Sequence, residues 1–190
     1  MNEKNSLQGN RVRLTALKKK DVSTIVQWHE DIGFLRLLDS NAAVPKSEDE
    51  IVSWIDECAK DHTIINLGIR LLEREMLVGT IGIFNIEWSN KVGDIVIGIG
   101  DRQNWGKGYG TEALDLIIYY AFNELNFHRL GINVLSYNER AIALYERTGF
   151  QREGVMREFG MRDGKRYDLI FYGMLRNEWP NSAFQRDEVG

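Results

Sequence analysis

Cysteine, histidine and proline are scarce in this sequence. Its 190 residues include a single cysteine, Cys58, three histidines and two prolines. One cysteine cannot form an intrachain disulfide, so we expect a reducing, cytoplasmic environment. The histidines, His29, His62 and His128, show no metal-ligand spacing with Cys58 or with one another. We therefore expect no metal site.

The sequence also lacks a long hydrophobic run and a strong charge of one sign. Its most apolar stretch, residues 113–122, is interrupted by Asp115 and has about half of the roughly 20 residues that a membrane-spanning helix needs. No positively charged start is followed by an apolar run, so nothing suggests export. The formal net charge of -4 argues against a nucleic-acid polyanion as the main partner. We expect neither a membrane nor a nucleic acid as partner.

The composition is that of one packed globular domain, with 43% hydrophobic and 27% charged residues. Alternating apolar and polar residues predict a strand over residues 11–17, and Asp21 is placed to cap the helix that follows. Residues 33–46 show no regular pattern. Ser47 and Glu50 then form a capping-box pair at the start of a second helix.

The rest of the chain shows strand and helix patterns in turn. They predict strands at residues 63–72, 77–86 and 92–99, a helix at 111–125, a strand at 129–135, a helix at 138–148, and strands at 150–161 and 165–175. Gly149 is placed to end the last helix, and Asp163-Gly164 is a hairpin signal between the last two strands. We therefore predict an α/β (α+β) fold with a mixed, mostly antiparallel central sheet of about seven strands and helices on both faces.

A glycine-rich segment, residues 101–112, lies between a predicted strand and the predicted buried helix. Backbone N–H groups and the positive end of that helix can hold an anion there, and glycines let the backbone approach it. A nucleoside-triphosphate loop would need Ser or Thr after Lys107, but Gly108 follows. A dinucleotide fold would need a parallel βαβ unit, whereas the preceding strands are predicted to be antiparallel. From the glycines alone, a phosphate site and a tightly packed turn both stay open.

Two segments narrow this choice. Trp105-Gly-Lys-Gly-Tyr-Gly-Thr-Glu-Ala113 and Asn138-Glu-Arg-Ala-Ile-Ala-Leu-Tyr-Glu-Arg-Thr-Gly-Phe150 resemble the two signature segments of the GNAT superfamily of acetyl-CoA-dependent N-acetyltransferases. The resemblance extends over residues 7–175 and is strongest to the branch with ribosomal-protein N-terminal amine acetyltransferases and spermidine acetyltransferases. Trp105 departs from the usual Gln or Arg at the start of the pyrophosphate loop. Because backbone amides bind the diphosphate, this departure matters little.

The resemblance implies a fold, a cosubstrate and a set of binding residues. It implies one N-acetyltransferase domain over residues 1–180 with a GNAT-like acyl-CoA N-acyltransferase fold, followed by a polar tail, residues 181–190. Acetyl-CoA would be the cosubstrate, and the pantetheine arm would pair with the strand ending near Ile99 where its neighbour diverges. The residues that would bind acetyl-CoA are Ile97, Gly98, Ile99, Trp105, Gly106, Lys107, Gly108, Tyr109, Gly110, Asn138 and Arg147.

The resemblance also implies direct transfer from acetyl-CoA to a primary amine in a ternary complex. Tyr145 would protonate the departing thiolate, since a phenol pKa of about 10 lies near a thiol pKa of about 8.5. A core tyrosine on an amphipathic helix is the alternative. Asp94, with Glu87 behind it, is the candidate carboxylate that would accept the amine proton through water. A solvated charge at the strand end is the alternative for both.

Several functional alternatives stay open at this point. The acceptor could be a protein N-terminal α-amine or a small-molecule amine, including a polyamine such as spermidine. The N-terminal half of the chain should line the acceptor site and contains four acidic residues whose positions the sequence does not fix: Asp31, Asp39, Glu48 and Asp49. A non-catalytic acyl-CoA-binding or sensing module and a nucleotide-binding protein are the competing functions. An apolar face on the last strands could form a homodimer.

Overall fold

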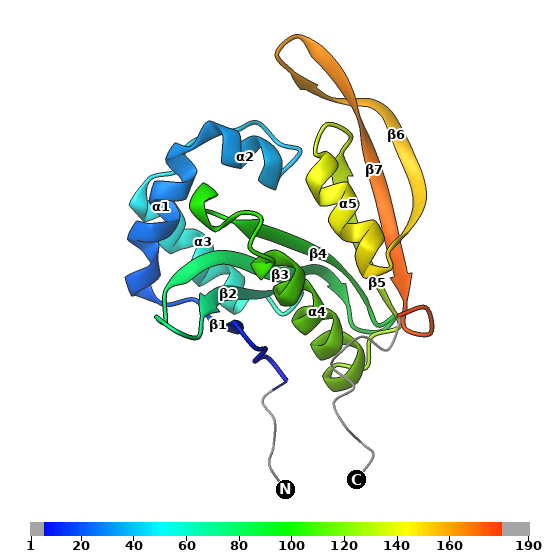
Figure 1. The fold of residues 1–190 in the computed structure, drawn as a ribbon, viewed down its shortest axis with the longest axis horizontal. Helices are drawn as coiled ribbons and strands as arrows, with labels where there is room; N and C mark the ends of the chain where they lie inside the picture. Colours follow the sequence, from blue (N-terminus) through cyan, green and yellow to red (C-terminus); the bar gives the residue numbers. More distant parts are fainter. Residues whose placement is uncertain (1–5, 180–190) are drawn as a thin grey trace, which may run out of the picture.

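The computed structural model describes residues 6–179, and in this part of the chain seven strands form one mixed sheet (Figure 1). Their order is β1-β2-β3-β4-β5-β7-β6, and every neighbouring pair is antiparallel except β4 and β5. The strands are β1 (Val12–Ala16), β2 (Ile65–Leu71), β3 (Leu77–Glu87), β4 (Val92–Ile99), β5 (Arg129–Leu135), β6 (Gln151–Arg162) and β7 (Lys165–Leu175). The predicted sheet is confirmed. The predicted polar tail, residues 181–190, lies outside the described residues.

Helices pack on both faces of this sheet, as predicted. The helices are η1 (Lys19–Asp21), α1 (Val22–Glu30), α2 (Ile32–Leu38), α3 (Glu48–Lys60), η2 (Arg102–Asn104), α4 (Tyr109–Tyr119), the π-helical η3 (Tyr120–Glu124) and α5 (Glu139–Thr148). Figure 1 shows α4 in front of the sheet, with α1, α2 and α3 grouped on its other side. The larger apolar core lies between α4 and the strands, and a smaller one lies among α1, α2 and α3.

Local sequence signals explain most helix ends and turns. Ser47 and Glu50 make the predicted capping box of α3, and Asn138 caps α5 by accepting from the N–H of Ala141 at 3.2 Å. Gly149 ends α5 with a φ of 105°. Asp163 and Gly164 both have positive φ, 50° and 73°, as the two-residue turn between β6 and β7 requires.

The helix α2 corrects the prediction that residues 33–46 are irregular. Asp31 accepts hydrogen bonds from the N–H groups of Gly33 and Phe34 and thereby caps it. Phe34 and Leu35 are buried, but α2 has only 7 residues, too few for a repeating apolar pattern to identify it. A second correction concerns α4, which begins at Tyr109 rather than at residue 111 and follows Gly108 in the left-handed region.

The strands β4 and β5 diverge, and this divergence positions the site. They pair only at Val92 with Arg129, Gly93 with Leu130 and Asp94 with Gly131. Beyond that point β4 continues along β3 to Ile99, while β5 continues along β7. The facing backbone edges therefore separate from each other and leave a wedge between the two halves of the sheet, as predicted.

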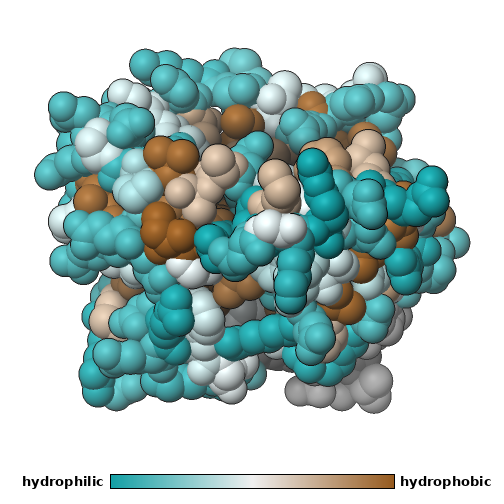
Figure 2. Space-filling view, turned by 90° about the horizontal axis from the view of Figure 1, so that it is seen from above, coloured by the Kyte–Doolittle hydropathy of each residue, from teal (hydrophilic) through white to brown (hydrophobic). Residues whose placement is uncertain are grey.

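The face of the molecule drawn in Figure 2 is mainly hydrophilic. Figure 2 shows hydrophobic residues as separate patches among hydrophilic ones on the face seen from above. Within residues 6–179, none of the helices combines the length and the apolar character that crossing a bilayer requires.

Candidate active site

A cavity of about 400 Å³ lies at the open end of the wedge between β4 and α5. It will be called the larger cavity. Its walls come from the end of β4, from residues 104–111 and from one face of α5, with α2 above. The lining residues are Phe34, Leu37, Leu38, Ile97, Gly98, Ile99, Asn104, Trp105, Gly106, Gly108, Tyr109, Gly110, Thr111, Asn138, Arg140, Ala141, Ala143, Leu144, Tyr145 and Arg147.

The glycine-rich loop, residues 105–110, forms one end of this cavity. Gly106 and Gly108 have φ values of 75° and 81°, which side chains other than glycine adopt only under strain. None of the backbone N–H groups from residue 106 to residue 111 donates a hydrogen bond to another part of the described chain. These donors, at the start of α4, form an arrangement suited to a bound anion.

Cationic side chains surround the same end of the cavity. Arg140 and Arg147 project from α5 and line it. The guanidinium of Arg140 lies 5.3 Å from the ring centroid of Trp105, and Arg147 Nη2 lies 3.4 Å from Thr111 Oγ1. Trp105 is itself fixed, because its Nε1 donates to the carbonyl oxygen of Ile99 at 2.7 Å. The indole therefore connects the glycine-rich loop to the end of β4.

Most of the predicted acetyl-CoA residues come together in this one cavity. The predicted residues that line it are Ile97, Gly98, Ile99, Trp105, Gly106, Gly108, Tyr109, Gly110, Asn138 and Arg147. Lys107 is the exception among the predicted binding residues. Its carbonyl oxygen accepts from Arg11 Nη1, and it is absent from the cavity wall.

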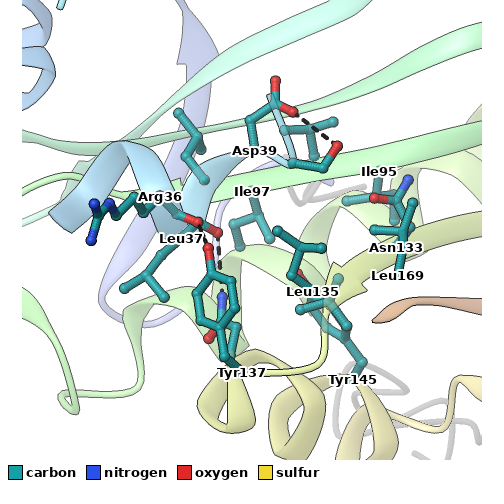
Figure 3. A pocket seen from close by; sticks show the side chains of 15 residues that line it. Arg36, Leu37, Asp39, Ile95, Ile97, Asn133, Leu135, Tyr137, Tyr145 and Leu169 are labelled. Carbon is teal, nitrogen blue, oxygen red and sulfur yellow. Dashed lines mark hydrogen bonds between the residues drawn. The ribbon is translucent and has the colours of Figure 1, made fainter. Parts of the chain in front are cut away.

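A smaller cavity of about 160 Å³ lies on the other side of the wedge, between β4, β5 and the end of α2 (Figure 3). Its wall exposes somewhat more polar than apolar surface, and Arg36, Ser40 and Asn133 are among the polar residues that line it. Asp39 is its only lining carboxylate, and that carboxylate already accepts from the N–H and Nδ2 of Asn41 at 2.9 and 3.0 Å.

Tyr145 lies where the two cavities meet, and it lines both. Its side chain is only 6% exposed, and its ring packs against Phe150 and Tyr172 with centroids 6.3 and 6.2 Å away. Burial raises the pKa of Tyr145 above its usual value. The phenol is therefore protonated at neutral pH.

The C-terminal end of α2 closes the top of the site, a feature that the sequence analysis missed. Tyr137 Oη donates to the carbonyl oxygen of Arg36, and Asn138 Nδ2 donates to that of Leu37 at 3.3 Å (Figure 3). These are carbonyl groups that a helix end leaves without partners of its own. The cap residue Asp31 was the one sequence signal for α2. Nothing in the sequence indicated that this helix would contact residues 137–138.

The carboxylates predicted to act on the acceptor are less central. Asp94 lines neither cavity. It accepts from Asn85 Nδ2 at 3.2 Å and lies over Gly131, where a Cβ would overlap with its Oδ1. Glu87 accepts from Asn90 Nδ2 at 2.7 Å in the turn after β3. Asp31 pairs instead with Arg102, with Nε–Oδ2 at 2.6 Å, which lowers the pKa of Asp31 to about 2.

The four acidic residues of the N-terminal half differ in where they lie relative to the two cavities. Glu48 and Asp49 lie in the first turn of α3, and neither they nor Asp31 line either cavity. Of these four residues, Asp39 alone lines the smaller cavity. Among residues 6–179, no three His, Cys, Asp or Glu side chains converge as metal ligands would.

Comparison with known proteins agrees with this geometry. The family described as acetyltransferase (GNAT) domain matches residues 11–151. The uncharacterized N-acetyltransferase p20 of Bacillus licheniformis is 25% identical over 92% of this chain and 98% of its own length. The putative ribosomal N-acetyltransferase YdaF of Bacillus subtilis is 36% identical over 57% of this chain and 59% of its own. The spermidine N-acetyltransferase of Vibrio cholerae, solved with CoA and spermine, superposes with a TM-score of 0.82 at 21% identity, over 90% of this chain and 98% of that one.

Proposed function

The chain belongs to the GNAT acetyltransferase family and is an acetyl-CoA-dependent N-acetyltransferase, and we propose that its acceptor is a peptide α-amine or another monoamine rather than a polyamine. The observation that carries this proposal is the smaller cavity beside Tyr145, which has a single carboxylate in its wall. A polyamine carries several ammonium groups, and each would need an anionic or strongly polar partner. A monoamine needs only to reach the thioester in neutral form.

The larger cavity supports a specific placement of acetyl-CoA. We assign the diphosphate to the N–H groups of the glycine-rich loop and its neighbouring cations Arg140 and Arg147. The pantetheine arm would follow the edge of β4 that β5 has left, pairing with the backbone of residues 97–99. Its thioester would then lie near Tyr145, at the junction with the smaller cavity.

The chemistry proposed at this junction is direct transfer. The amine nitrogen attacks the thioester carbonyl carbon, and a backbone N–H of β4 stabilises the oxyanion that forms. When the carbon–sulfur bond breaks, the thiolate takes the proton of Tyr145 Oη. Desolvation raises the pKa of a thiol as well as that of a phenol. The pKa of the CoA thiol in this site therefore rises together with the pKa of Tyr145, and proton transfer between them stays feasible.

The role of Asp94 in this scheme is indirect. It lies at the point where β4 and β5 part, one residue before Ile95, which lines the smaller cavity. We assign it the acceptance of the amine proton through water. A peptide α-amine, with a pKa near 7.7 to 8.0, is already about 10% neutral at pH 7 and needs little help.

The names of the relatives point to two acceptors. YdaF is named as a putative ribosomal N-acetyltransferase, whereas the Vibrio cholerae structure is of a spermidine enzyme. The smaller cavity, with one carboxylate already engaged by Asn41, favours the first kind of acceptor. The single cysteine supports assigning the reaction to the reducing cytoplasm.

An acceptor comparison tests this proposal. We would measure initial rates of CoA release with an uncharged tetrapeptide bearing a free N-terminus, with the same peptide N-acetylated as control, and with spermidine. We expect saturable turnover with the free peptide, none with the blocked one, and a kcat/KM for spermidine at least about 10-fold lower. A higher kcat/KM for spermidine would overturn the acceptor assignment while leaving the acetyltransferase activity intact.

The Tyr145→Phe variant tests the assigned acid. Phenylalanine keeps the ring packing but has no proton to donate, so we expect kcat to fall about 100-fold, within the range for general acid catalysis. The Kd for CoA, measured by calorimetry, should stay within about two-fold. Wild-type kcat in this variant would remove Tyr145 from the mechanism, and lost CoA binding would assign it a structural role.

A further inference from the structure

Arg11, just before β1, contacts the back of the glycine-rich loop from nearly one hundred residues away in sequence. Its Nη1 donates to the carbonyl oxygen of Lys107 at 2.7 Å, and its Nη2 lies 3.4 Å from that of Gly108. Its side chain is 53% exposed and lines neither cavity, so this contact is made from outside the site. One guanidinium thus engages two successive loop carbonyls.

The two carbonyl groups that Arg11 contacts set the direction of two N–H groups, and the Gly108 carbonyl oxygen accepts in addition from the backbone N–H of Glu112 at 3.1 Å. In a trans peptide unit the carbonyl and the N–H of the following residue point in opposite directions. With the carbonyls of Lys107 and Gly108 turned toward Arg11, the N–H groups of Gly108 and Tyr109 face the other way. Gly108 and Tyr109 both line the larger cavity. We therefore expect the N–H groups of Gly108 and Tyr109 to face the larger cavity when Arg11 holds the two carbonyl groups from outside.

A buried carboxylate holds Arg11 in this position. Glu112, in the first turn of α4, is 9% exposed and accepts from Arg11 Nε at 3.0 Å and from the Arg11 backbone N–H at 2.8 Å. The backbone N–H of Asn10 donates to the same carboxylate. Gly9 leaves room for it, since a Cβ there would overlap with Glu112 Oε1. The ring of Tyr109 lies 5.6 Å below the guanidinium.

We propose that Arg11 is a positioning residue that fixes the N–H groups of the glycine-rich loop in the orientation that receives the acetyl-CoA diphosphate. The inference rests on the proposed placement of that diphosphate. A loop held in its binding conformation loses less entropy when the anion binds, so binding is tighter. The planar guanidinium suits this role because it can engage two carbonyls and Glu112 at once, whereas an ammonium cannot match that fork.

A purely structural role makes a different prediction. If Arg11 only joins the start of β1 to α4, replacing it lowers stability without changing which part of the cosubstrate is recognised. The distinguishing measurement is thus a comparison of acetyl-CoA with S-acetylpantetheine, which carries the thioester and the pantetheine arm but no diphosphate.

We would measure KM and kcat for both acetyl donors in wild type, Arg11→Met and Arg11→Lys. Arg13→Met is the matched control, because Arg13 is on β1 and pairs with Glu75 instead of the loop. Hydrogen bonds from a charged donor predict a 10- to 100-fold rise in the KM for acetyl-CoA in Arg11→Met, with kcat changed less. We expect a clear rise in Arg11→Lys too, and an unchanged KM for acetylpantetheine in every variant.

Each result has a defined meaning. Equal rises in both KM values, or no rise, would overturn the role of Arg11, as would full activity of Arg11→Lys or an equal effect in Arg13→Met. If wild type itself used acetylpantetheine as well as acetyl-CoA, the proposed diphosphate placement would fail instead. Thermal unfolding of each variant, measured in parallel, separates lost binding from lost folding.

Discussion

Asn138 Nδ2 donates a hydrogen bond to the backbone carbonyl oxygen of Leu37 at 3.3 Å and so joins the start of α5 to the end of α2. The other side-chain atom of the same amide, Oδ1, caps α5 by accepting from Ala141. One residue therefore serves the helix with its oxygen and the top of the site with its nitrogen. The two roles can be separated by substitution.

Asn138→Ser should keep the cap and lose the contact with α2. Serine caps helices about as well as asparagine, so we expect its unfolding free energy to stay within a few tenths of a kcal/mol of wild type. Loss of the Nδ2 donor should raise the KM for acetyl-CoA about 3- to 10-fold. Asn138→Ala, the comparison variant, should show the same KM rise and lose about 1 kcal/mol in addition. Wild-type kinetics in Asn138→Ser would show that Nδ2 contributes nothing to the site.

Asp94→Asn should reduce activity in a way that depends on pH. At pH 7 about 10% of a peptide α-amine is neutral, so a group that accepts its proton can gain at most about 10-fold. At pH 9 most of the amine is already neutral. We expect kcat/KM to fall about 10-fold at pH 7 and less than about 3-fold at pH 9, with Glu87→Gln near wild type at both. A loss independent of pH would contradict the assignment.

Asp115 provides a pH-dependent stability prediction. Burial in α4, with Glu112 nearby and Arg147 opposing, raises the pKa of Asp115 to about 6, above its ordinary value of 3.8. The folded protein then holds this proton more tightly than the unfolded chain, so stability falls as pH rises from about 4 to 6. Allowing for partial exposure, the loss is about 1 to 2 kcal/mol.

Asp115→Asn removes that loss. It should be more stable than wild type above pH 6, and the difference should vanish below pH 4. Urea unfolding at pH 4, 5, 6 and 7.5 measures this, with Asp56→Asn on the exposed side of α3 as control. A constant difference across the range would mean that packing, not ionisation, explains the effect.

Arg70 and Asp21 form a buried ion pair with both side chains only 4% exposed. Arg70 Nε also donates to Thr15 Oγ1 at 2.8 Å. Arg70→Met leaves the carboxylate of Asp21 buried without the cation that balances its charge. We therefore expect the free energy of unfolding, measured in urea, to fall by about 3 to 5 kcal/mol. Glu75→Gln, which breaks the exposed pair with Arg13, should cost at most about 1 kcal/mol. Similar small losses in both variants would contradict the prediction.

The sequence predicted the position of Asp21 relative to α1 but not the contacts of its side chain. Its position predicted a cap for α1, and it is indeed the residue before that helix. Its carboxylate, however, makes no cap hydrogen bond and instead accepts from Lys18 N–H at 2.7 Å and pairs with Arg70. Arg70 follows 49 residues later on β2, and no local pattern connects the two.

The sequence by itself determined the features that depend on neighbouring residues. Strand alternation, the capping box at Ser47, the Asp163-Gly164 turn and the glycine-rich loop all follow from local conformational preferences and spacing. They were sufficient to predict the sheet and most of its helices, whereas the residues around the larger cavity followed from the resemblance of two segments to the GNAT superfamily. The short helix α2 was not predicted, because two turns are too few to show a helical repeat of apolar residues.

Tertiary structure alone decided how distant segments meet. The closure of the site by α2 and the contact of Arg11 with Lys107 both join residues far apart in sequence. Asp94 lies outside both cavities for the same reason, since strand register rather than residue type sets its place. Local preferences act over a few residues, whereas these contacts form only when the packed core brings separate elements together.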